Sequence, residues 1–422
     1  MSGTILKGER DRLADRSVLI AVRTQFDAAL AMLELDGLVR RMMVVPPDFS
    51  EDFRASAVRQ GEVDAIVCDD LRTCADIDVP RCVVSAPAPN NLSYERRRTE
   101  WVLPTSGTTG QPKLVAHSLE GLAGAFGSRG DQRPVWATFY DIRRYGGLQI
   151  FLRAVTGGAP LVISDADEPL CDHVARMAEI GVTHLSGTPS HWRKLLMSGE
   201  ASRISPRYVR LSGEIADRAI LEALAGAYPQ ARIVHAYAST EAGVGFEVTD
   251  GREGFPASYL DGVAGVEMRL VDGSLHIRSQ RTASNYVGRD ELRLKDAAGF
   301  VDTDDLVEVK GDRCYFRGRR AGTLNVGGLK VNPEEVEQVI NAHDAVRISL
   351  VKARRSPITG DLIVADVVLK DESTQPARKQ LVRDEILSNC RARLERHKVP
   401  AMIGFVPALA MTPAGKLLRR DL

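Results

Sequence analysis

The chain has 422 residues, too many for one ordinary core, and 44% of them are hydrophobic, enough to fill two or three structural units. Lysine plus arginine and aspartate plus glutamate each total 56, so no net charge would draw the chain to nucleic acid or to an anionic membrane. The six cysteines show no Cys-x-x-Cys spacing, which argues against a zinc site and a disulfide framework and favours a reducing cytoplasm.

Apolar segments alternate with segments of helical periodicity along most of the chain. Strands are expected at Val63–Cys68, Arg81–Val84 and Leu161–Ile163, and helices at Phe26–Arg40 and Asp172–Ile180. No stretch reaches the roughly 18 apolar residues of a membrane span, and the first residues lack the apolar core of a signal peptide. The alternation predicts a layered α/β domain.

The character of the sequence changes near Arg319, after a glycine-bearing turn. We expect four further elements there: a helix at Pro333–Asn341, strands at Arg347–Ala353 and Leu362–Leu369, and a long amphipathic helix around Ala377–Arg396.

These elements predict a small, mobile α+β domain of about a hundred residues. We place the large domain at residues 1–318 and the small one at 319–422, with a hinge in the charged segment Gly318–Gly322.

Hydroxyl groups and glycines are concentrated in the segment Leu103–Lys113. Glycines let a backbone approach a ligand closely, hydroxyls donate to phosphate oxygens, and a lysine adds charge. The segment is not a Walker loop, because Pro112 precedes the lysine and Leu114 follows it. A flexible linker is the alternative interpretation. The candidate phosphate-binding residues are Thr105, Ser106, Gly107, Thr108, Thr109, Gly110 and Lys113.

Residues Thr105–Lys113 read Thr-Ser-Gly-Thr-Thr-Gly-Gln-Pro-Lys and resemble in full the phosphate loop of the adenylate-forming superfamily. That superfamily contains acyl-CoA synthetases, the adenylation domains of peptide synthetases and luciferases. Four further segments match it in the expected order, and the chain looks most like a short acyl- or aryl-CoA ligase.

The segment Ala236–Gly243 resembles the superfamily's Tyr-Gly-x-Thr-Glu motif. The resemblance implies that Tyr237 lies against adenine, Thr240 holds the α-phosphate and Glu241 positions Mg²⁺. A single carboxylate suits Mg²⁺, which shares its shell with phosphates and water. The alternative interpretation of the segment is a helix N-cap at Ser239 or Thr240, with Glu241 in the first turn.

Two segments depart from the usual pattern. Leu211–Ala216 resembles the adenine-side loop, except that Glu214, Ile215 and Ala216 replace its last three residues; we still assign these three to ATP binding. Val301–Leu306 resembles Thr-Gly-Asp-Leu, which would make Asp305 the acceptor of both ribose hydroxyls. Asp304 stands where glycine is usual.

The segment Gly318–Glu337 is similar to the one that joins the two domains of these enzymes. The resemblance implies Arg319 near the ribose and phosphates, and Gly327 and Gly328 along the channel that admits a pantetheine thiol. Ala321 stands where a hinge aspartate is usual, so either rotation is freer or the two-state switch is weaker.

The segment Met411–Lys416 resembles the C-terminal Thr-x-x-Gly-Lys loop. The resemblance implies that Lys416 reaches into the active site during adenylation and, with Thr240 and Glu241, is a catalytic residue. Without that match, a lysine so near the C-terminus would be read as a solvated surface residue.

The acid pocket is the least specified part. The segment Ala137–Gln149 occupies its place, and no apolar tunnel for a long acyl tail is evident, so we expect an aromatic or compact polar acid. The alternative is that Arg143 and Arg144 form salt bridges with Asp131 or Asp141. The candidate pocket residues are Tyr140, Arg144, Gly146, Gly147, His235 and Ala236.

The function implied is ATP- and Mg²⁺-dependent activation of a small-molecule carboxylic acid as acyl-AMP, followed by transfer to the thiol of CoA. Three alternatives stay open: transfer to the phosphopantetheine of a carrier protein, activation of an unusual oxyacid, and a non-catalytic nucleotide-binding role. Only about a hundred residues precede the phosphate loop, so we expect the large domain to be shortened at its N-terminus. A homodimer would cover the surface exposed in this way.

Overall fold

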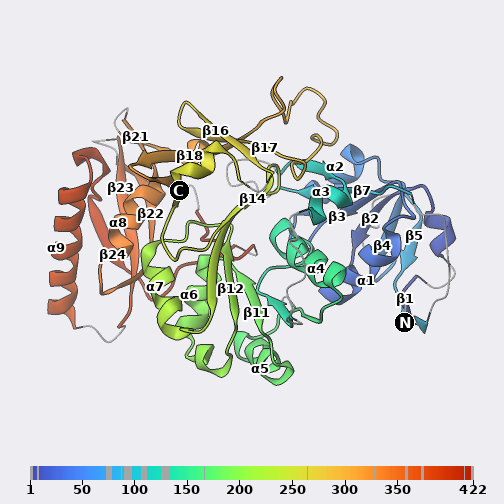
Figure 1. Ribbon diagram of the computed structural model, residues 1–422, viewed down its shortest axis with the longest axis horizontal. Helices are drawn as coiled ribbons and strands as arrows, with labels where there is room; N and C mark the ends of the chain where they lie inside the picture. The colour runs from blue at the N-terminus through green and yellow to red at the C-terminus, as the bar shows by residue number, and fades with distance from the viewer. Residues whose placement is uncertain are drawn as a thin grey trace.

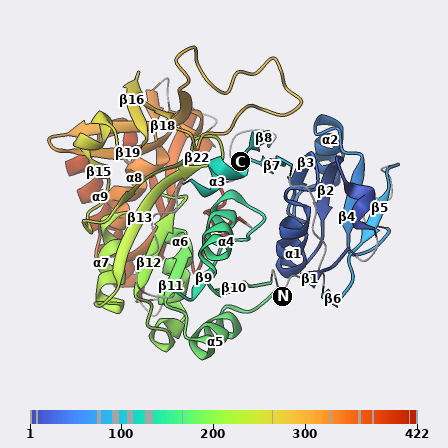
Figure 2. The same ribbon diagram turned by 45° about the vertical axis from the view of Figure 1, so that its right-hand side comes forward.

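The computed structural model describes residues 3–6, 9–72, 78–86, 88–89, 97–105, 112–124, 134–165, 167–263, 265–326, 329–356, 360–371, 375–412 and 414–419. Figure 1 shows the N-terminal elements at one end of the molecule, a second α/β unit in the middle and the C-terminal elements at the other end. In the turned view of Figure 2 the N-terminal unit lies to one side of the rest of the molecule.

The N-terminal unit is built on a six-stranded sheet in the order β5–β4–β2–β3–β7–β8, in which only β8 is antiparallel to its neighbour. The central strands are continuous apolar runs, as expected for strands buried on both faces. The strands are β2 (Ser17–Ala21), β3 (Arg41–Val44), β4 (Ala65–Cys68), β5 (Arg81–Val83), β7 (Glu100–Pro104) and β8 (Leu114–His117), the helices are α1 (Gln25–Leu35), α2 (Glu51–Gln60) and α3 (Leu119–Ala123), and the small pair β1 (Gly3–Thr4) and β6 (Ala88–Pro89) lies beside them.

The middle unit has a second six-stranded sheet in the order β10–β9–β11–β12–β13–β14, parallel except for β14. Apolar side chains of α5, α6 and α7 pack with β11 and β12, and α4 packs with β12 and β13 in a separate cluster. The strands are β9 (Trp136–Thr138), β10 (Leu161–Val162), β11 (His184–Gly187), β12 (Tyr208–Ser212), β13 (Arg232–Ser239) and β14 (Gly243–Val248), and the helices are α4 (Tyr145–Gly157), α5 (Leu170–Ile180), α6 (Pro189–Met197) and α7 (Arg218–Ala227).

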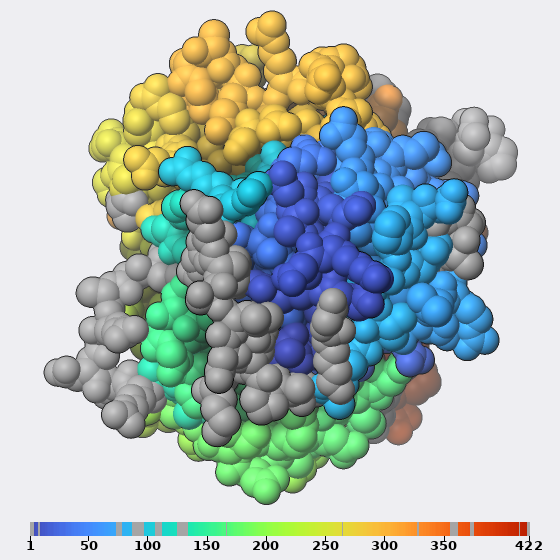
Figure 3. Space-filling model, turned by 90° about the vertical axis from the view of Figure 1, so that its right-hand side faces the viewer, coloured from blue at the N-terminus to red at the C-terminus, as the bar shows by residue number. Residues whose placement is uncertain are grey.

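A five-stranded antiparallel sheet in the order β15–β19–β18–β17–β16 completes the large domain. Its strands are β15 (Phe255–Pro256), β16 (Glu267–Val271), β17 (Ser274–Arg278), β18 (Val301–Lys310) and β19 (Arg313–Arg319). In Figure 3 the N-terminal residues occupy the centre of the visible face, with part of the segment before β18 above them.

The C-terminal elements have a hydrophobic core of their own, made from residues after Thr323. A three-stranded sheet in the order β22–β23–β24 is covered by two helices. The elements are β20 (Leu324–Val326), β21 (Leu329–Val331), α8 (Pro333–Asn341), β22 (Val346–Ser356), β23 (Gly360–Leu369), α9 (Pro376–Arg393) and β24 (Met402–Phe405).

This architecture confirms the predicted fold class, a large α/β domain followed by a small α+β domain. The expected helix at Pro333–Asn341 has those bounds, whereas the one expected at Phe26–Arg40 ends at Leu35. It ends there because Asp36 adopts extended backbone, and the indole of Trp101 donates to its carboxylate over 3.0 Å. The boundary between residues 318 and 319 falls at the end of β19 and stays a prediction. Within the described residues no helix is both long and apolar enough to cross a bilayer.

Candidate active site

A cavity of about 1200 Å³ lies between the two domains and is lined by residues of both. The large domain contributes the loop after β12, the later residues of β13 and β19, and Asp305 in the middle of β18. The small domain contributes α8, β22 and the segment around Lys416. A cavity of this size holds a ligand larger than most drug-sized molecules.

Asp305 is the centre of a small network on one side of the cavity. Its carboxylate accepts a hydrogen bond from the hydroxyl of Tyr237 over 2.6 Å and another from the guanidinium of Arg319 over 3.3 Å. The Tyr237 ring stacks on Phe246 and on Phe316, with centroid distances of 5.6 and 5.1 Å. Burial raises the pKa of Tyr237, and the Asp305 charge raises it further. Tyr237, Asp305 and Arg319 are thus brought together and joined by hydrogen bonds.

Thr240 and Glu241 form the tip of the hairpin between β13 and β14. No helix begins here, so the alternative of a helix N-cap is wrong; the hydroxyl of Ser239 instead accepts from the amide of Ala242 over 2.9 Å. The imidazole Nε2 of His117 donates to the carbonyl of Thr240 over 2.8 Å and ties the hairpin tip to β8. Burial lowers the pKa of His117 to about 4.

The base of the predicted phosphate loop is a closed pair. The amide of Thr105 donates to the carbonyl of Lys113 over 2.7 Å, and the Thr105 hydroxyl accepts from the Lys113 amide over 3.0 Å. The Lys113 ammonium lies 4.9 Å from the centroid of the Tyr286 ring. The loop residues Ser106, Gly107, Thr108, Thr109 and Gly110 lie outside the described residues, as do Gly327 and Gly328.

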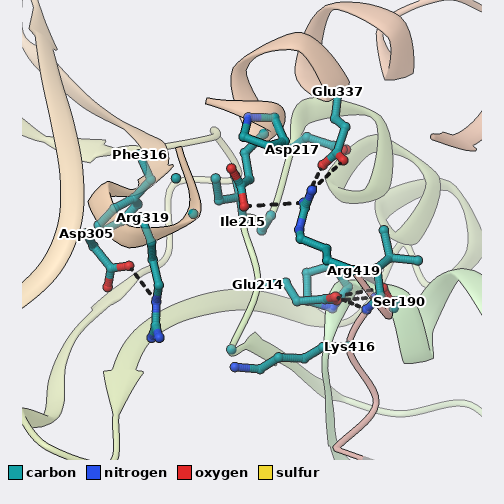
Figure 4. A pocket seen from close by; sticks show the side chains of 18 of the residues that line it. Ser190, Glu214, Ile215, Asp217, Asp305, Phe316, Arg319, Glu337, Lys416 and Arg419 are labelled. Atoms are coloured by element: carbon teal, nitrogen blue, oxygen red, sulfur yellow. Dashed lines mark hydrogen bonds and ion pairs between the residues drawn. The ribbon is translucent and has the colours of Figure 1, made fainter. Parts of the chain in front are cut away.

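Lys416 is presented by a tight hairpin. The Thr412 amide donates to the Lys416 carbonyl over 2.7 Å, and the Lys416 amide donates to the Thr412 hydroxyl over 3.2 Å. Its side chain extends into the cavity on the side where Arg319 and Asp305 lie (Figure 4). Burial lowers the pKa of Lys416, the Arg319 charge lowers it further, and Glu214, Asp305 and Glu241 act in the opposite direction. The candidate catalytic groups therefore influence one another electrostatically.

Sequence reasoning missed the groups that seat the lysine hairpin. Glu214 accepts hydrogen bonds from Ser190 at the start of α6 and from the amide of Leu417. The Thr188 hydroxyl donates to the carbonyl of Gly415 over 2.6 Å. Thr188-Pro189 is a helix-start signal, so α6 itself could have been predicted, but not its contact with the C-terminal hairpin.

Ile215 and Ala216, the two residues after Glu214, line the cavity, as do Ala236 and His235 on β13. Successive residues of a strand point to opposite faces, so His235 and Ala236 face different sides of the sheet. The His235 Nε2 is hydrogen-bonded to the carbonyl of Arg252 over 2.9 Å, and burial lowers its pKa. Its assignment to the acid pocket stays a prediction.

The remaining acid-pocket candidates lie at the start of α4. The Tyr140 hydroxyl donates to the carbonyl of Ser212 over 2.7 Å, and Gly146 lies against the Tyr140 ring. Gly147 packs on the backbone of Asp141 so closely that an added Cβ would lie 2.2 Å from its carbonyl oxygen. The contact at Gly147 requires glycine, whereas a side chain at Gly146 would make only ordinary contact with the ring. The assignment of Tyr140 and the two glycines to the acid pocket stays a prediction.

The two arginines of this segment are engaged in ion pairs. Arg143 pairs with Asp141 over 2.7 Å, as the alternative interpretation expected. Arg144 lines the cavity and pairs with Asp48, a partner that the sequence did not indicate. Asp131 lies outside the described residues.

Comparison with known proteins decides the family. Residues 17–286 match the AMP-binding enzyme family, and residues 335–416 match the AMP-binding enzyme C-terminal domain. The chain belongs to the AMP-binding enzyme family. The resemblance inferred from the five motifs is confirmed.

Individual relatives of this AMP-binding enzyme are distant. It is 25% identical over 370 residues to 4-coumarate–CoA ligase-like 5 of Oryza sativa subsp. japonica. That alignment covers 80% of this chain but only 64% of the length of the rice protein. It is 24% identical over 433 residues to 2-succinylbenzoate–CoA ligase of Bacillus velezensis, and the alignment covers 96% of this chain and 82% of the Bacillus protein. A solved anthranilate CoA ligase in complex with anthranoyl-AMP has a TM-score of 0.80 at 17% identity, covering 96% and 86%, which shows the shared fold.

Proposed function

We propose that this protein is an AMP-forming acid–thiol ligase. In the first half-reaction a carboxylate oxygen of the acid bonds to the α-phosphorus of ATP, and the bond from that phosphorus to pyrophosphate breaks. In the second, the thiol of CoA loses its proton to solvent, its sulfur bonds to the acyl carbon, and the bond from that carbon to the phosphate oxygen of AMP breaks. The observation that carries this proposal is the entry of Lys416 into a cavity shared with Asp305, Arg319 and Glu214.

The roles of the nucleotide-binding residues follow from this arrangement. Asp305 has the acceptor oxygens for the ribose hydroxyls, and its bond to Arg319 orients both side chains. Thr105 and Lys113 would close the phosphate loop around the β- and γ-phosphates. Lys416 would bridge the attacking carboxylate and the α-phosphate, where negative charge develops.

Glu241 is the residue that would hold Mg²⁺. Among the described residues no group of three or more His, Cys, Asp or Glu side chains could enclose a metal, which fits an ion held by one carboxylate together with phosphates and water. When bound, Mg²⁺ supplies charge neutralisation to the phosphates. Glu241 also acts electrostatically on Arg319 and Lys416, so its position suits that role.

The surroundings of α4 support an aromatic or compact polar acid. Arg210 on β12 is only 3% exposed and influences Tyr140 and Tyr145 electrostatically. Gln149 is 4% exposed, and neither polar atom of its amide has a hydrogen-bond partner among the described residues. Buried polar groups of this kind are unsuited to a long acyl tail. The aryl-CoA ligase names of the relatives point the same way.

The test is acid-dependent exchange of pyrophosphate into ATP with a panel of aryl, short-chain, medium-chain and amino acids. We expect exchange with aryl or compact polar acids, and thioester formation when CoA is added. Exchange without transfer to CoA would favour a carrier-protein thiol as acceptor. Absence of exchange with every acid would contradict the proposal and favour an unusual oxyacid or a non-catalytic role. A cytoplasmic location and a homodimer stay predictions.

A further inference from the structure

We propose that Glu214 is a positioning residue for Lys416, acting as the seat on the large domain for the hairpin that carries the lysine. This inference rests on the proposed ligase function. Glu214 was assigned from the sequence to nucleotide binding, whereas its carboxylate is occupied by protein donors on both oxygens.

The carboxylate joins two segments that are far apart in the sequence. Its Oε2 accepts from the backbone amide of Ser190 over 2.9 Å, and its Oε1 accepts from the Ser190 hydroxyl over 3.0 Å. The same Oε1 accepts from the amide of Leu417 over 3.1 Å. Leu417 directly follows Lys416, so this bond fixes the backbone from which the lysine side chain departs.

The site is suited to a negative charge. Ser190 lies in the first turn of α6, where amides without helical partners and the helix dipole favour an anion. Among the described residues no lysine, arginine or histidine nitrogen lies within 4.0 Å of the Glu214 carboxylate, so its donors there are neutral groups. The Glu214 charge also acts at longer range on the cations Lys416 and Arg419, so removing it weakens the seat and lowers the pKa of both groups.

Two neighbouring contacts give the hairpin a single position on α6. The Thr188 hydroxyl accepts from the His191 amide as the helix N-cap and also donates to the Gly415 carbonyl over 2.6 Å. Gly415 packs on the His191 ring so closely that an added Cβ would lie 1.9 Å from its Cε1. All these contacts require the present arrangement of the two domains, so Glu214 favours the arrangement that places Lys416 in the cavity.

The experiment compares Glu214→Gly with Glu214→Gln, which keeps the size of the side chain and removes its charge. We expect kcat for pyrophosphate exchange to fall about 10–100-fold in Glu214→Gly, the value of a charge-assisted hydrogen bond, and less in Glu214→Gln. KM for ATP should stay within about threefold, and thioester formation from supplied acyl-adenylate should be unchanged or faster, because that step does not use Lys416. Glu222→Gln, which removes an exposed carboxylate on α7, is the matched control and should behave as wild type.

A second readout does not depend on catalysis. Hydrogen–deuterium exchange of the peptide 411–419 should be faster in both Glu214 variants than in wild type and in Glu222→Gln. If the deuterium uptake of this peptide is the same in the variants and in wild type, Glu214 does not hold the hairpin in place, whatever the enzymatic activity. Faster deuterium exchange with an unchanged kcat would overturn the positioning role. A loss of activity expressed only in KM for ATP would also overturn it and would favour a direct contact with the nucleotide. Failure of the ligase proposal would instead appear as an absence of pyrophosphate exchange in wild type.

Discussion

The backbone amide of Ala321 donates a hydrogen bond to the carboxylate of Asp304 over 3.0 Å. The sequence showed these two residues as separate departures from the family pattern, an aspartate in place of glycine and an alanine in place of the hinge aspartate. In the structure they meet, and the carboxylate absent from the hinge position is supplied from β18. Asp304 also has a φ of +63°, a left-handed conformation that explains why glycine is usual there.

Asp304 therefore offers a test of stability that is independent of catalysis. Asp304→Ala keeps the left-handed strain and loses the hydrogen bond, so we expect its free energy of unfolding to fall by about 1–2 kcal/mol. Asp304→Gly loses the same bond but removes the strain, so it should lie within about 1 kcal/mol of wild type. Denaturant unfolding measures both, with Asp304→Asn as the control that tolerates the conformation and retains an acceptor. Equal losses in the Ala and Gly variants would contradict the role of backbone strain.

Gly415 should be intolerant of any side chain. Its φ is +71°, and an added Cβ would overlap the His191 ring, so Gly415→Ala should push the lysine hairpin away from α6. We expect pyrophosphate exchange to fall by about 100-fold or more, in line with the loss of a positioned catalytic group. Gly251→Ala is the matched control, because Gly251 has a φ of +73° but open space where its Cβ would lie. It should lose some stability and keep its exchange activity; similar activities in the two variants would contradict the proposed contact.

His117 should make the large domain less stable in mild acid. Burial lowers its pKa from 6.5 to about 4, so as the pH falls the unfolded chain binds the proton first. This contribution is complete above pH 6.5 and is lost between pH 6.5 and 4, a change of roughly 3 kcal/mol at most. We expect His117→Gln to show a correspondingly smaller pH dependence of the free energy of unfolding over that range. An unchanged slope would mean that folding does not lower the pKa of His117.

Lys416 should set an alkaline limit to adenylation. Burial and the Arg319 charge lower its pKa below the ordinary 10.5, and the neutral amine cannot stabilise negative charge on the phosphate. The profile of kcat/KM for exchange against pH should therefore fall on the alkaline side at a pH below 10.5. Lys416→Arg, which stays charged, should lack this limit in its residual activity. An alkaline limit of the same position in Lys416→Arg would assign it to another group.

Contiguous motifs were predictable from the sequence, and contacts between distant segments were not. The segment Thr105–Lys113 carries its own chemistry in its order of residues, and the structure closes its ends as a hairpin loop. The Glu214–Leu417 bond joins residues 203 positions apart, and no local pattern pairs a carboxylate with a backbone amide. The same holds for Arg144, whose partner Asp48 lies 96 positions away.

The two helices and the two long strands of the small domain were predicted because each carries a strong local signal, whereas the short strands β20, β21 and β24 were not. Pro333 at the first position of α8 and the apolar periodicity after it define that helix. The acid pocket has no comparable signal, since the polarity of Gln149 and Arg210 has meaning only when α4 lies on β12. The substrate class consequently stays a proposal.

The most direct test of the central claim is pyrophosphate exchange by Lys416→Ala beside thioester formation by the same variant from supplied acyl-adenylate. We expect exchange to fall by about 10²–10³-fold, because a charge aimed at the transferring phosphate is lost, and thioester formation to stay within about threefold of wild type. A Lys416→Ala variant that retains full exchange would contradict the assignment of Lys416 to the adenylation step.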